Sequence, residues 1–340
     1  MKEFLRKKNI IFSAKRYGID ALGAMAQGLF ASLLIGTIIS TLGEQLGIGI
    51  LVTVGGYAKG ATGAAMAISI GVALQCPPLV LFSLAAVGMA ANELGGAGGP
   101  LAVLVVTIFA AEFGKLVSKE TKIDIIVTPF VTICVGVLLS LGCAPAIGAA
   151  ASTVGTAIMW ATELQPFFMG IIVSVIVGIA LTLPISSAAI CAALSLTGLA
   201  GGAAVAGCCA QMVGFAVMSF KENKWGGLLA QGLGTSMLQM GNIVRNPKIW
   251  IPPTLASMVT GPLSTMVFHL ENIPAGSGMG TCGLVGPIGI YTAMQGSGNS
   301  MMWPGILLIC FVLPAVLTLF FGALCRKAGW IKEGDLKLDL

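Results

Sequence analysis

Long apolar segments with very few charges dominate this chain and decide what it can fold into. They cover residues 21–43, 46–74, 77–92, 99–117, 125–143, 145–162, 166–183, 186–200, 202–220, 226–241, 250–268 and 303–325. Only 9% of the residues are charged and 56% are apolar, whereas a soluble domain carries about 25% charged residues. Because a bilayer-spanning helix needs about 20 apolar residues, the chain is predicted to be an all-α polytopic membrane protein with about ten transmembrane helices.

The distribution of basic residues predicts how the chain is threaded through the bilayer. Lysines and arginines gather in the N-terminus, in Lys115–Lys122, Lys221–Lys224 and Arg245–Lys248, and from Arg326 onward, and such clusters face the cytoplasm. We therefore expect residues 1–20 to form a cytoplasmic or interfacial lead-in, 21–325 the membrane domain and 326–340 a cytoplasmic tail. The net charge of +5 comes mostly from these loops and indicates membrane topology, not nucleic-acid binding.

Two cytoplasmic loops, at Lys119 and Lys221, require an even number of crossings between them. Five apolar segments lie there, so 145–162 or 186–200 is expected to be re-entrant or to lie along the surface. Re-entrant hairpins also suit the 47 glycines, since small residues let helices approach closely.

An internal repeat is predicted from two similar runs, ISIGVALQCPP from Ile68 and VSVIVGIALTLPI from Val173. Each run leads into a glycine-rich break, and each copy closes with Lys-Glu-x-Lys. The predicted copies cover about 65–124 and 170–224. Repeats with short, broken helices are a common transporter architecture, with the site at the repeat interface.

The segment 226–300 holds the polar groups most typical of a binding site. It contains the single histidine, His269, and a carboxylate two residues later, Glu271. Before Pro274 the backbone is expected to be extended or turned, so both side chains are predicted to line one cavity, Glu271 accepting from a substrate hydroxyl and His269 donating. The alternative is that both mark a membrane–water interface, where charged groups are tolerated.

A glycine-rich loop and four amides extend this predicted site. Gly276 and Gly278 begin a run in which backbone amides can approach a ligand, which favours the tip of a re-entrant hairpin. The amides of Gln231, Gln239, Asn242 and Asn246 suit a neutral, polyol-like solute. Each amide taken alone is more often a hydrogen-bonding partner of a neighbouring helix.

The first half of the chain carries isolated charged residues within or near apolar segments, Glu44, Lys59, Glu93 and Glu112. Glu93 or Glu112 would be the titrating acid of an ion-coupled carrier, which is a further alternative. No nucleophile, triad or metal-ligand cluster is recognised in the sequence, and no cofactor is expected. The nine scattered cysteines are interpreted as small buried hydrophobes.

From Gly241 to Pro253 the chain reads GNIVRNPKIWIPP and resembles the membrane-embedded IIC component of the bacterial sugar phosphotransferase system. In that family a Gly/Asn-rich re-entrant segment leads into an Asn-Pro and a proline-containing helix. The whole chain is similar to a divergent, stand-alone branch whose members are described as toxin-expression regulators of the perfringolysin-regulator group.

The resemblance implies a homodimeric permease in the bacterial cytoplasmic membrane, with both termini in the cytoplasm and an occluded sugar site. Family members use a hairpin glutamate, and often a histidine, to hold the hydroxyl that receives phosphate. The chain departs from this pattern, since Asn242-Ile243-Val244 stands where the family's Asn-Glu-Pro is expected. Glu271 with His269 is our substitute candidate, by chemistry and not by motif.

A second departure concerns the phosphoryl donor. No IIA or IIB domain is recognised, and Cys76-Pro77-Pro78 lies in an apolar segment, so a donor would be a separate IIA/IIB phosphocarrier protein. The first hypothesis is a permease for a small polar solute, most simply a sugar or sugar derivative. The alternative is a membrane sensor or regulator of gene expression that binds such a ligand without moving it.

Overall fold

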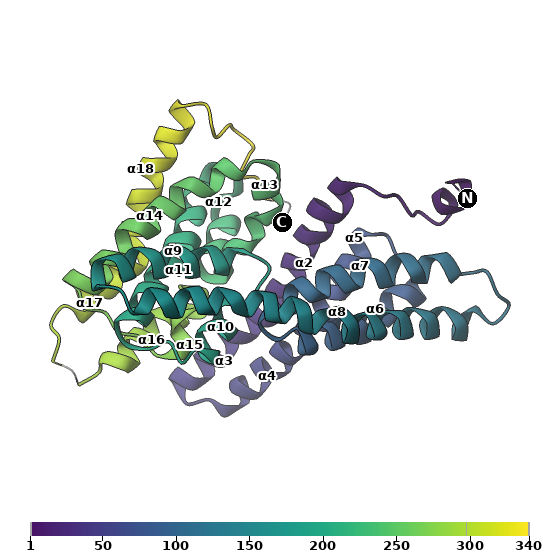
Figure 1. Cartoon of the computed structure of the whole chain (residues 1–340), viewed down its shortest axis with the longest axis horizontal. Helices are drawn as coiled ribbons and strands as arrows, with labels where there is room; N and C mark the ends of the chain where they lie inside the picture. The colour runs from purple at the N-terminus through teal and green to yellow at the C-terminus, as the bar shows by residue number, and fades with distance from the viewer. Residues whose placement is uncertain (1, 297, 339–340) are drawn as a thin grey trace. The chain divides into compact units, whose positions relative to one another are not determined.

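The computed structural model describes residues 2–296 and 298–338, and helices make up most of this described chain (Figure 1). It divides into two compact units: unit 1 is Met1–Ser40 with Ile48–Ala151, and unit 2 is Thr41–Gly47 with Ser152–Leu340. In hydrocarbon every backbone N–H and C=O needs a protein partner, and a helix supplies these partners within one segment. The all-α prediction is confirmed for the described residues, where β-type pairing is limited to an isolated Gly198–Asn272 bridge.

Five helical stretches among the described residues are long and apolar enough to cross a membrane. They are Arg16–Leu46, Pro78–Val117, Asp124–Thr162, Gly198–Met218 and Met302–Lys327, and shorter apolar helices cover Thr62–Ala73, Pro166–Thr182 and Cys282–Met294. These stretches confirm a multi-pass membrane protein. The count of about ten spans, the re-entrant hairpins and the orientation of the termini stay predictions.

Unit 1 is a stack of helices connected by short turns. Its helices are α1 (Lys2–Lys7), η1 (Arg16–Asp20), α2 (Ala21–Leu29), η2 (Phe30–Leu34), α3 (Ile35–Leu46, which ends in unit 2), α4 (Gly49–Gly60), α5 (Thr62–Ala73), α6 (Pro78–Gly95), η3 (Gly96–Gly98), α7 (Gly99–Val117) and α8 (Asp124–Thr162, which also ends in unit 2). The apolar segments 125–143 and 145–162 thus form one helix, which continues through Pro145.

The core of unit 1 depends on small residues at helix contacts. α5 packs against α2, α6 and α7, and α6 packs against α7. Gly63 of α5 and Gly88 of α6 lie so close that a Cβ on either would come within 3.0 Å of the other's carbonyl oxygen. Close backbone approach of this kind is typical of helix association in membranes.

Unit 2 contains the larger helical bundle and several interrupted helices. Its elements are α9 (Pro166–Thr182), α10 (Ser187–Ala193), α11 (Gly198–Met218), α12 (Phe220–Leu229), η4 (Ala230–Gly234), η5 (Ser236–Gln239), α13 (Met240–Arg245), η6 (Pro247–Trp250), α14 (Ile251–Pro262), η7 (Leu263–Val267), α15 (Pro274–Ser277), η8 (Cys282–Leu284), α16 (Val285–Met294), α17 (Met302–Leu307), η9 (Leu308–Val312) and α18 (Leu313–Lys327).

Helix α11 is the centre of unit 2. It packs against α9, α14 and α18 (Figure 1), and 89% of its most apolar 18-residue window is buried. Glycine makes this packing possible, because a Cβ at Gly207 would overlap the carbonyl oxygen of Ser174 in α9. α14 approaches α9 in the same way, at Gly261 against Gly170.

The predicted repeat copies correspond to two sets of three consecutive helices. Residues 65–124 contain most of α5 with α6 and α7, and residues 170–224 contain most of α9 with α10 and α11. The middle helices differ in length, 18 residues in α6 and 7 in α10. The repeat therefore stays a prediction about sequence ancestry, while the helix order of the two copies is the same.

We predict that Gly207→Ala destabilises unit 2, because the new Cβ would push α11 away from the Ser174 carbonyl. Overpacking of this kind costs about 1–3 kcal/mol, and the measurement is the melting temperature of the detergent-purified protein. Gly142→Ala in α8 is the matched control, since no atom lies within 4 Å of the added Cβ. An unchanged melting temperature for Gly207→Ala would contradict the packing described here.

Candidate functional site

Two breaks in the helices of unit 2 form the candidate site. The first, residues 183–197, separates α9 from α11 and contains the short helix α10, whose Ser186 Oγ accepts from the Ala189 N–H at 3.2 Å. The second, residues 268–284, separates η7 from α16 and contains α15 and η8. Discontinuous helices of this kind expose backbone groups that can hold a ligand.

The two breaks are tied together by hydrogen bonds to each other's backbone. Ser187 Oγ donates to the Gly278 carbonyl at 2.8 Å, and Ser277 Oγ donates to the Leu196 carbonyl at 2.8 Å. The Asn272 N–H donates to the Gly198 carbonyl at 3.3 Å, which forms the isolated bridge. Backbone groups in each break lie outside a helix, and the side chains of the other break supply hydrogen bonds to some of them.

Asn272 organises the glycine-rich loop from the inside. It is 1% exposed, its Nδ2 donates to the Gly286 carbonyl at 3.3 Å, and its Oδ1 accepts from the Ile273 N–H at 2.8 Å. A Cβ at Gly276 would meet the Asn272 side chain, and a Cβ at Gly278 would meet the Ser187 carbonyl. These two predicted site glycines thus lie in the packed contact between the breaks.

His269 and Glu271 lie on one exposed face of the second break. Burial alternates along this segment, with Phe268, Leu270 and Asn272 buried and His269 and Glu271 exposed. The exposure of both side chains is observed, and their joint lining of one cavity stays a prediction. Among the described residues neither side chain makes a hydrogen bond or ion pair, so both are available to a ligand.

The backbone at His269 is unusual. Its φ angle is +47°, in the left-handed region that non-glycine residues seldom adopt and that clusters at functional sites. The chain is held there by the Leu270 N–H, which donates to the Ser264 carbonyl at 2.9 Å. This bond fixes the point where η7 ends and the exposed His269–Glu271 segment begins.

Three of the four predicted amides, Gln231, Gln239 and Asn242, are hydrogen-bonded to one another and not to His269 or Glu271. Gln239 Nε2 donates to Gln231 Oε1 at 2.9 Å, and Asn242 Nδ2 donates to Gln239 Oε1 at 2.8 Å. Gln231 is anchored in turn by the Ser219 hydroxyl and the Gly227 carbonyl, each at 2.9 Å. The structure therefore brings three of them into direct contact.

Three of the four predicted amides, Gln239, Asn242 and Asn246, donate to the C-terminal tail, residues 328–338. Gln239 donates to the Leu336 carbonyl at 3.1 Å and Asn242 to the Lys337 carbonyl at 2.9 Å. Asn246 donates to the Trp330 carbonyl at 3.0 Å and to Asp335 Oδ2 at 2.7 Å. In this structure the tail occupies the donors that were predicted for a solute, and their role in solute binding stays a prediction.

A buried polar cluster around Gln211 was not found by sequence reasoning. Gln211 is fully buried in α11 and accepts from Trp250 Nε1 at 3.0 Å, and its Nε2 donates to Thr254 Oγ1 at 3.3 Å. Thr182 Oγ1 lies 3.4 Å from Gln211 Oε1 and 2.8 Å from Ser236 Oγ. The only sequence feature that could have indicated this cluster was the single glutamine within the apolar segment 202–220.

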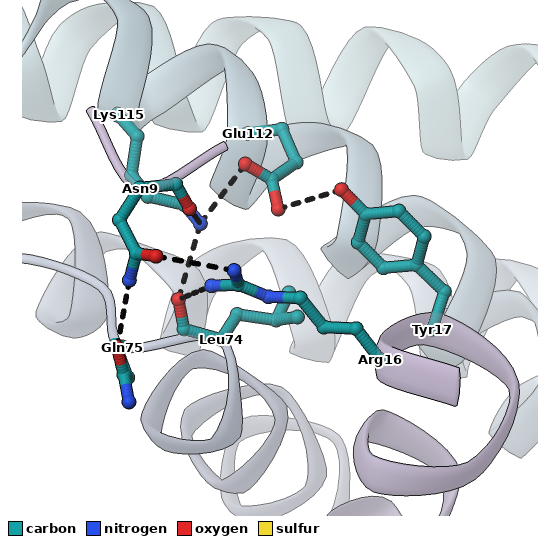
Figure 2. A network of polar contacts seen from close by, with 7 residues as sticks. All are labelled: Asn9, Arg16, Tyr17, Leu74, Gln75, Glu112 and Lys115. Carbon is teal, nitrogen blue, oxygen red and sulfur yellow. Dashed lines mark hydrogen bonds and ion pairs between the residues drawn. The ribbon is translucent and has the colours of Figure 1, made fainter. Parts of the chain in front are cut away.

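Unit 1 contains a second polar network, centred on the buried lysine Lys115 (Figure 2). Lys115 is 1% exposed, and its Nζ lies 2.9 Å from Glu112 Oε2 one turn earlier in α7. Tyr17 donates its hydroxyl to Glu112 Oε1 at 3.0 Å. Lys115 also donates to the carbonyls of Asn9 (3.2 Å) and Leu74 (3.1 Å).

The remaining members of the network fasten the N-terminal segment to the α5–α6 connection. Arg16 donates to Asn9 Oδ1 at 3.2 Å and to the Leu74 carbonyl, and Asn9 Nδ2 donates to Gln75 Oε1 at 2.8 Å (Figure 2). In the sequence, Lys115 lies at the end of the apolar segment 99–117 and opens the basic cluster Lys115–Lys122, and Glu112 is a charged residue within the same segment. Their i, i+3 spacing was the signal that they pair.

Comparison with known proteins adds one match. The family described as "Phosphotransferase system, EIIC" matches residues 19–338. No curated protein and no solved structure is significantly similar to the chain.

We predict that Leu336→Ala releases the C-terminal tail. Leu336 is fully buried, and truncating such a leucine costs about 2–5 kcal/mol. The expected result is a lower melting temperature and faster limited proteolysis within residues 328–338. Lys337→Ala is the control, because that exposed side chain is removed while the carbonyl bound by Asn242 is kept. Equal proteolysis of both variants would contradict the docking.

Breaking the Lys115–Glu112 pair from one side is expected to be costly. Glu112→Gln leaves a buried ammonium without a counter-charge, for which losses of about 3–5 kcal/mol are typical. The double variant Glu112→Leu/Lys115→Met removes both charges and is expected to recover part of the lost melting temperature. Glu44→Gln, at an exposed glutamate, is the control. If Glu112→Gln melts like the Glu44 variant, the pair is not a buried charge pair.

Proposed function

Because the chain belongs to the phosphotransferase system EIIC family, a family of sugar permease components, we propose that it binds a sugar or sugar derivative at the paired breaks of unit 2 and carries it across the membrane. The observation that supports this site is the exposed face shared by His269 and Glu271. Nearby buried groups are already satisfied by protein partners, whereas these two side chains are free among the described residues.

The chemistry of the two side chains suits a sugar hydroxyl. A carboxylate accepts hydrogen bonds only, while a neutral imidazole offers one donor and one acceptor. Glu271 would therefore accept from a hydroxyl while His269 donates to a neighbouring oxygen. The φ of +47° at His269 is unfavourable for a non-glycine residue. Because the surrounding packing must hold the backbone in this conformation, the angle favours a preorganised site.

The family implies that IIA and IIB phosphocarrier proteins work with this component. In the proposed reaction the sugar hydroxyl oxygen forms the new bond to phosphorus as the bond from phosphorus to the phosphocarrier breaks. The hydroxyl proton passes to Glu271 or His269, whichever lies within hydrogen-bond reach. A homodimer in the bacterial cytoplasmic membrane, with both termini in the cytoplasm, completes the proposal.

A sensor that binds the sugar without moving it is the second candidate. One observation favours it: Asn242, in the Asn242-Ile243-Val244 segment where the family's glutamate is expected, is bound to the tail through the Lys337 carbonyl. In a sensor, ligand binding near Asn242 would change the docking of the tail, and the tail would transmit that change to a cytoplasmic partner. Uptake of a bound sugar into proteoliposomes distinguishes the two, since only a permease accumulates it.

The predicted outcome for the site is a loss of binding in Glu271→Gln and His269→Ala. Each variant removes a charge-assisted or polar hydrogen bond worth about 1.5–3 kcal/mol, so the Kd for the sugar should rise by about tenfold or more. The measurement is thermal stabilisation of the purified protein across a panel of sugars, with Glu163→Gln as the matched exposed control.

Two results would contradict this placement of the site. If a sugar that stabilises the wild-type protein stabilises both variants equally, the site lies elsewhere in the chain. If non-sugar polar metabolites stabilise the wild-type protein and no sugar does, the proposed solute class is wrong. The two variants are then tested with those metabolites to locate the site.

A further inference from the structure

Two cavities in unit 1 are each lined by residues of the N-terminal segment and of α7. The first has a volume of about 450 Å³ and a strongly basic lining, with the side chains of Lys7, Lys8, Lys115, Lys119 and Glu120 around it. The second has a volume of about 540 Å³ and is lined almost wholly by apolar side chains. Both belong to unit 1, so the inference is independent of the proposed sugar site in unit 2.

The basic pocket has more positive charge than its own carboxylates neutralise. Lys8 pairs with Glu120 and donates to the Ser118 carbonyl, and Lys115 pairs with Glu112. Lys7 and Lys119 are exposed, and within the described chain neither reaches a carboxylate at ion-pair distance. Two of the four lining lysines are therefore paired, and Asp124 lies near Lys119, from whose backbone N–H it accepts at 2.6 Å. The ammonium groups of Lys7 and Lys119 stay without an ion-pair partner among the described residues, which favours an anion in this pocket.

The neighbouring groove has the shape and chemistry for a hydrocarbon chain. Leu5, Ile10 and Phe12 contribute one wall from the N-terminal segment, and Ile108, Phe109 and Leu116 contribute the other from α7. Phe12 is 77% exposed and Phe109 is 53% exposed. Apolar surface of this size at the end of a span is stable only against another apolar group.

The polar network of Figure 2 contains residues that line both cavities. Glu112 lines the groove and pairs at 2.9 Å with Lys115, which lines the pocket. The N-terminal segment contributes Asn9 to the pocket and the adjacent Ile10 to the groove. The network thus connects residues of the basic pocket directly to residues of the apolar groove.

From this arrangement we propose that unit 1 binds an anionic phospholipid, with its headgroup phosphate among the lysines and an acyl chain in the groove. α7 ends at Val117, so the lysines of the following loop lie where a spanning helix meets the headgroup layer, and basic clusters at that level attract anionic lipid. A soluble phosphate would leave the groove empty. A phosphorylated protein partner would fill the pocket but has no group suited to the groove.

The test compares lipids and matched charge variants in the full-length protein. Phosphatidylglycerol and phosphatidylcholine with the same chains are titrated into detergent-purified protein, and bound lipid is counted by native mass spectrometry. Wild type is expected to prefer phosphatidylglycerol by at least about tenfold, and Lys7→Gln/Lys119→Gln should lose most of this preference. Lys15→Gln/Lys122→Gln removes the same charge from exposed lysines outside the pocket lining and should keep the preference.

The acyl-chain part of the proposal has its own arm. Phe109→Ser is expected to weaken phosphatidylglycerol binding while leaving the binding of glycerol phosphate, which has no chain, unchanged. Three outcomes overturn the proposal: equal binding of the two lipids, equal loss in both lysine double variants, or glycerol phosphate binding as tightly as phosphatidylglycerol. The last outcome would identify a soluble-anion site instead of a lipid site.

Discussion

The structure of unit 2 depends on satisfying the backbone where its helices are interrupted. A broken helix at membrane depth leaves N–H and C=O groups that water cannot reach, and each costs several kcal/mol if unpaired. The breaks at 183–197 and 268–284 meet this requirement together, through Ser187, Ser277 and the Asn272–Gly198 bridge. This mutual satisfaction allows irregular backbone to exist there, and it leaves His269 and Glu271 exposed at its edge.

Glycine determines how closely the surrounding elements approach. Gly207 lets α11 contact α9, and Gly276 and Gly278 let the second break close over Asn272 and Ser187. The glycine-rich loop was interpreted from the sequence as a place where backbone amides approach a ligand. In the structure Gly276 and Gly278 instead allow close packing between the two breaks. This packing supports the exposed His269–Glu271 segment from behind. A rigid support is needed to hold a small polar solute in a defined orientation.

Much of the fold, and part of the site, could be predicted from the sequence, because hydropathy and helix period are local properties. The helical membrane class followed from composition. The cavity shared by His269 and Glu271, expected from extended or turned backbone before Pro274, stays a prediction, and the structure shows both side chains exposed. The partners of polar groups are long-range and could not be predicted in the same way. Asn242 and Lys337 are 95 residues apart, and no local pattern indicates that the tail would occupy the amides. The carbonyl partners of Lys115, Asn9 and Leu74, likewise lie far from it in sequence.

The proposed sugar site requires that the exposed side chains of His269 and Glu271 are reached from water while the buried Leu270 and Asn272 are not. Single cysteines at 269, 270, 271 and 272, in a background whose partly exposed Cys76, Cys134 and Cys143 are replaced by alanine, test this with a membrane-impermeant maleimide. We predict rapid labelling of His269→Cys and Glu271→Cys, slow labelling of Leu270→Cys and Asn272→Cys, and protection of the first two by a bound sugar. Uniform labelling of all four positions, or labelling of the first two that no stabilising sugar slows, would contradict it.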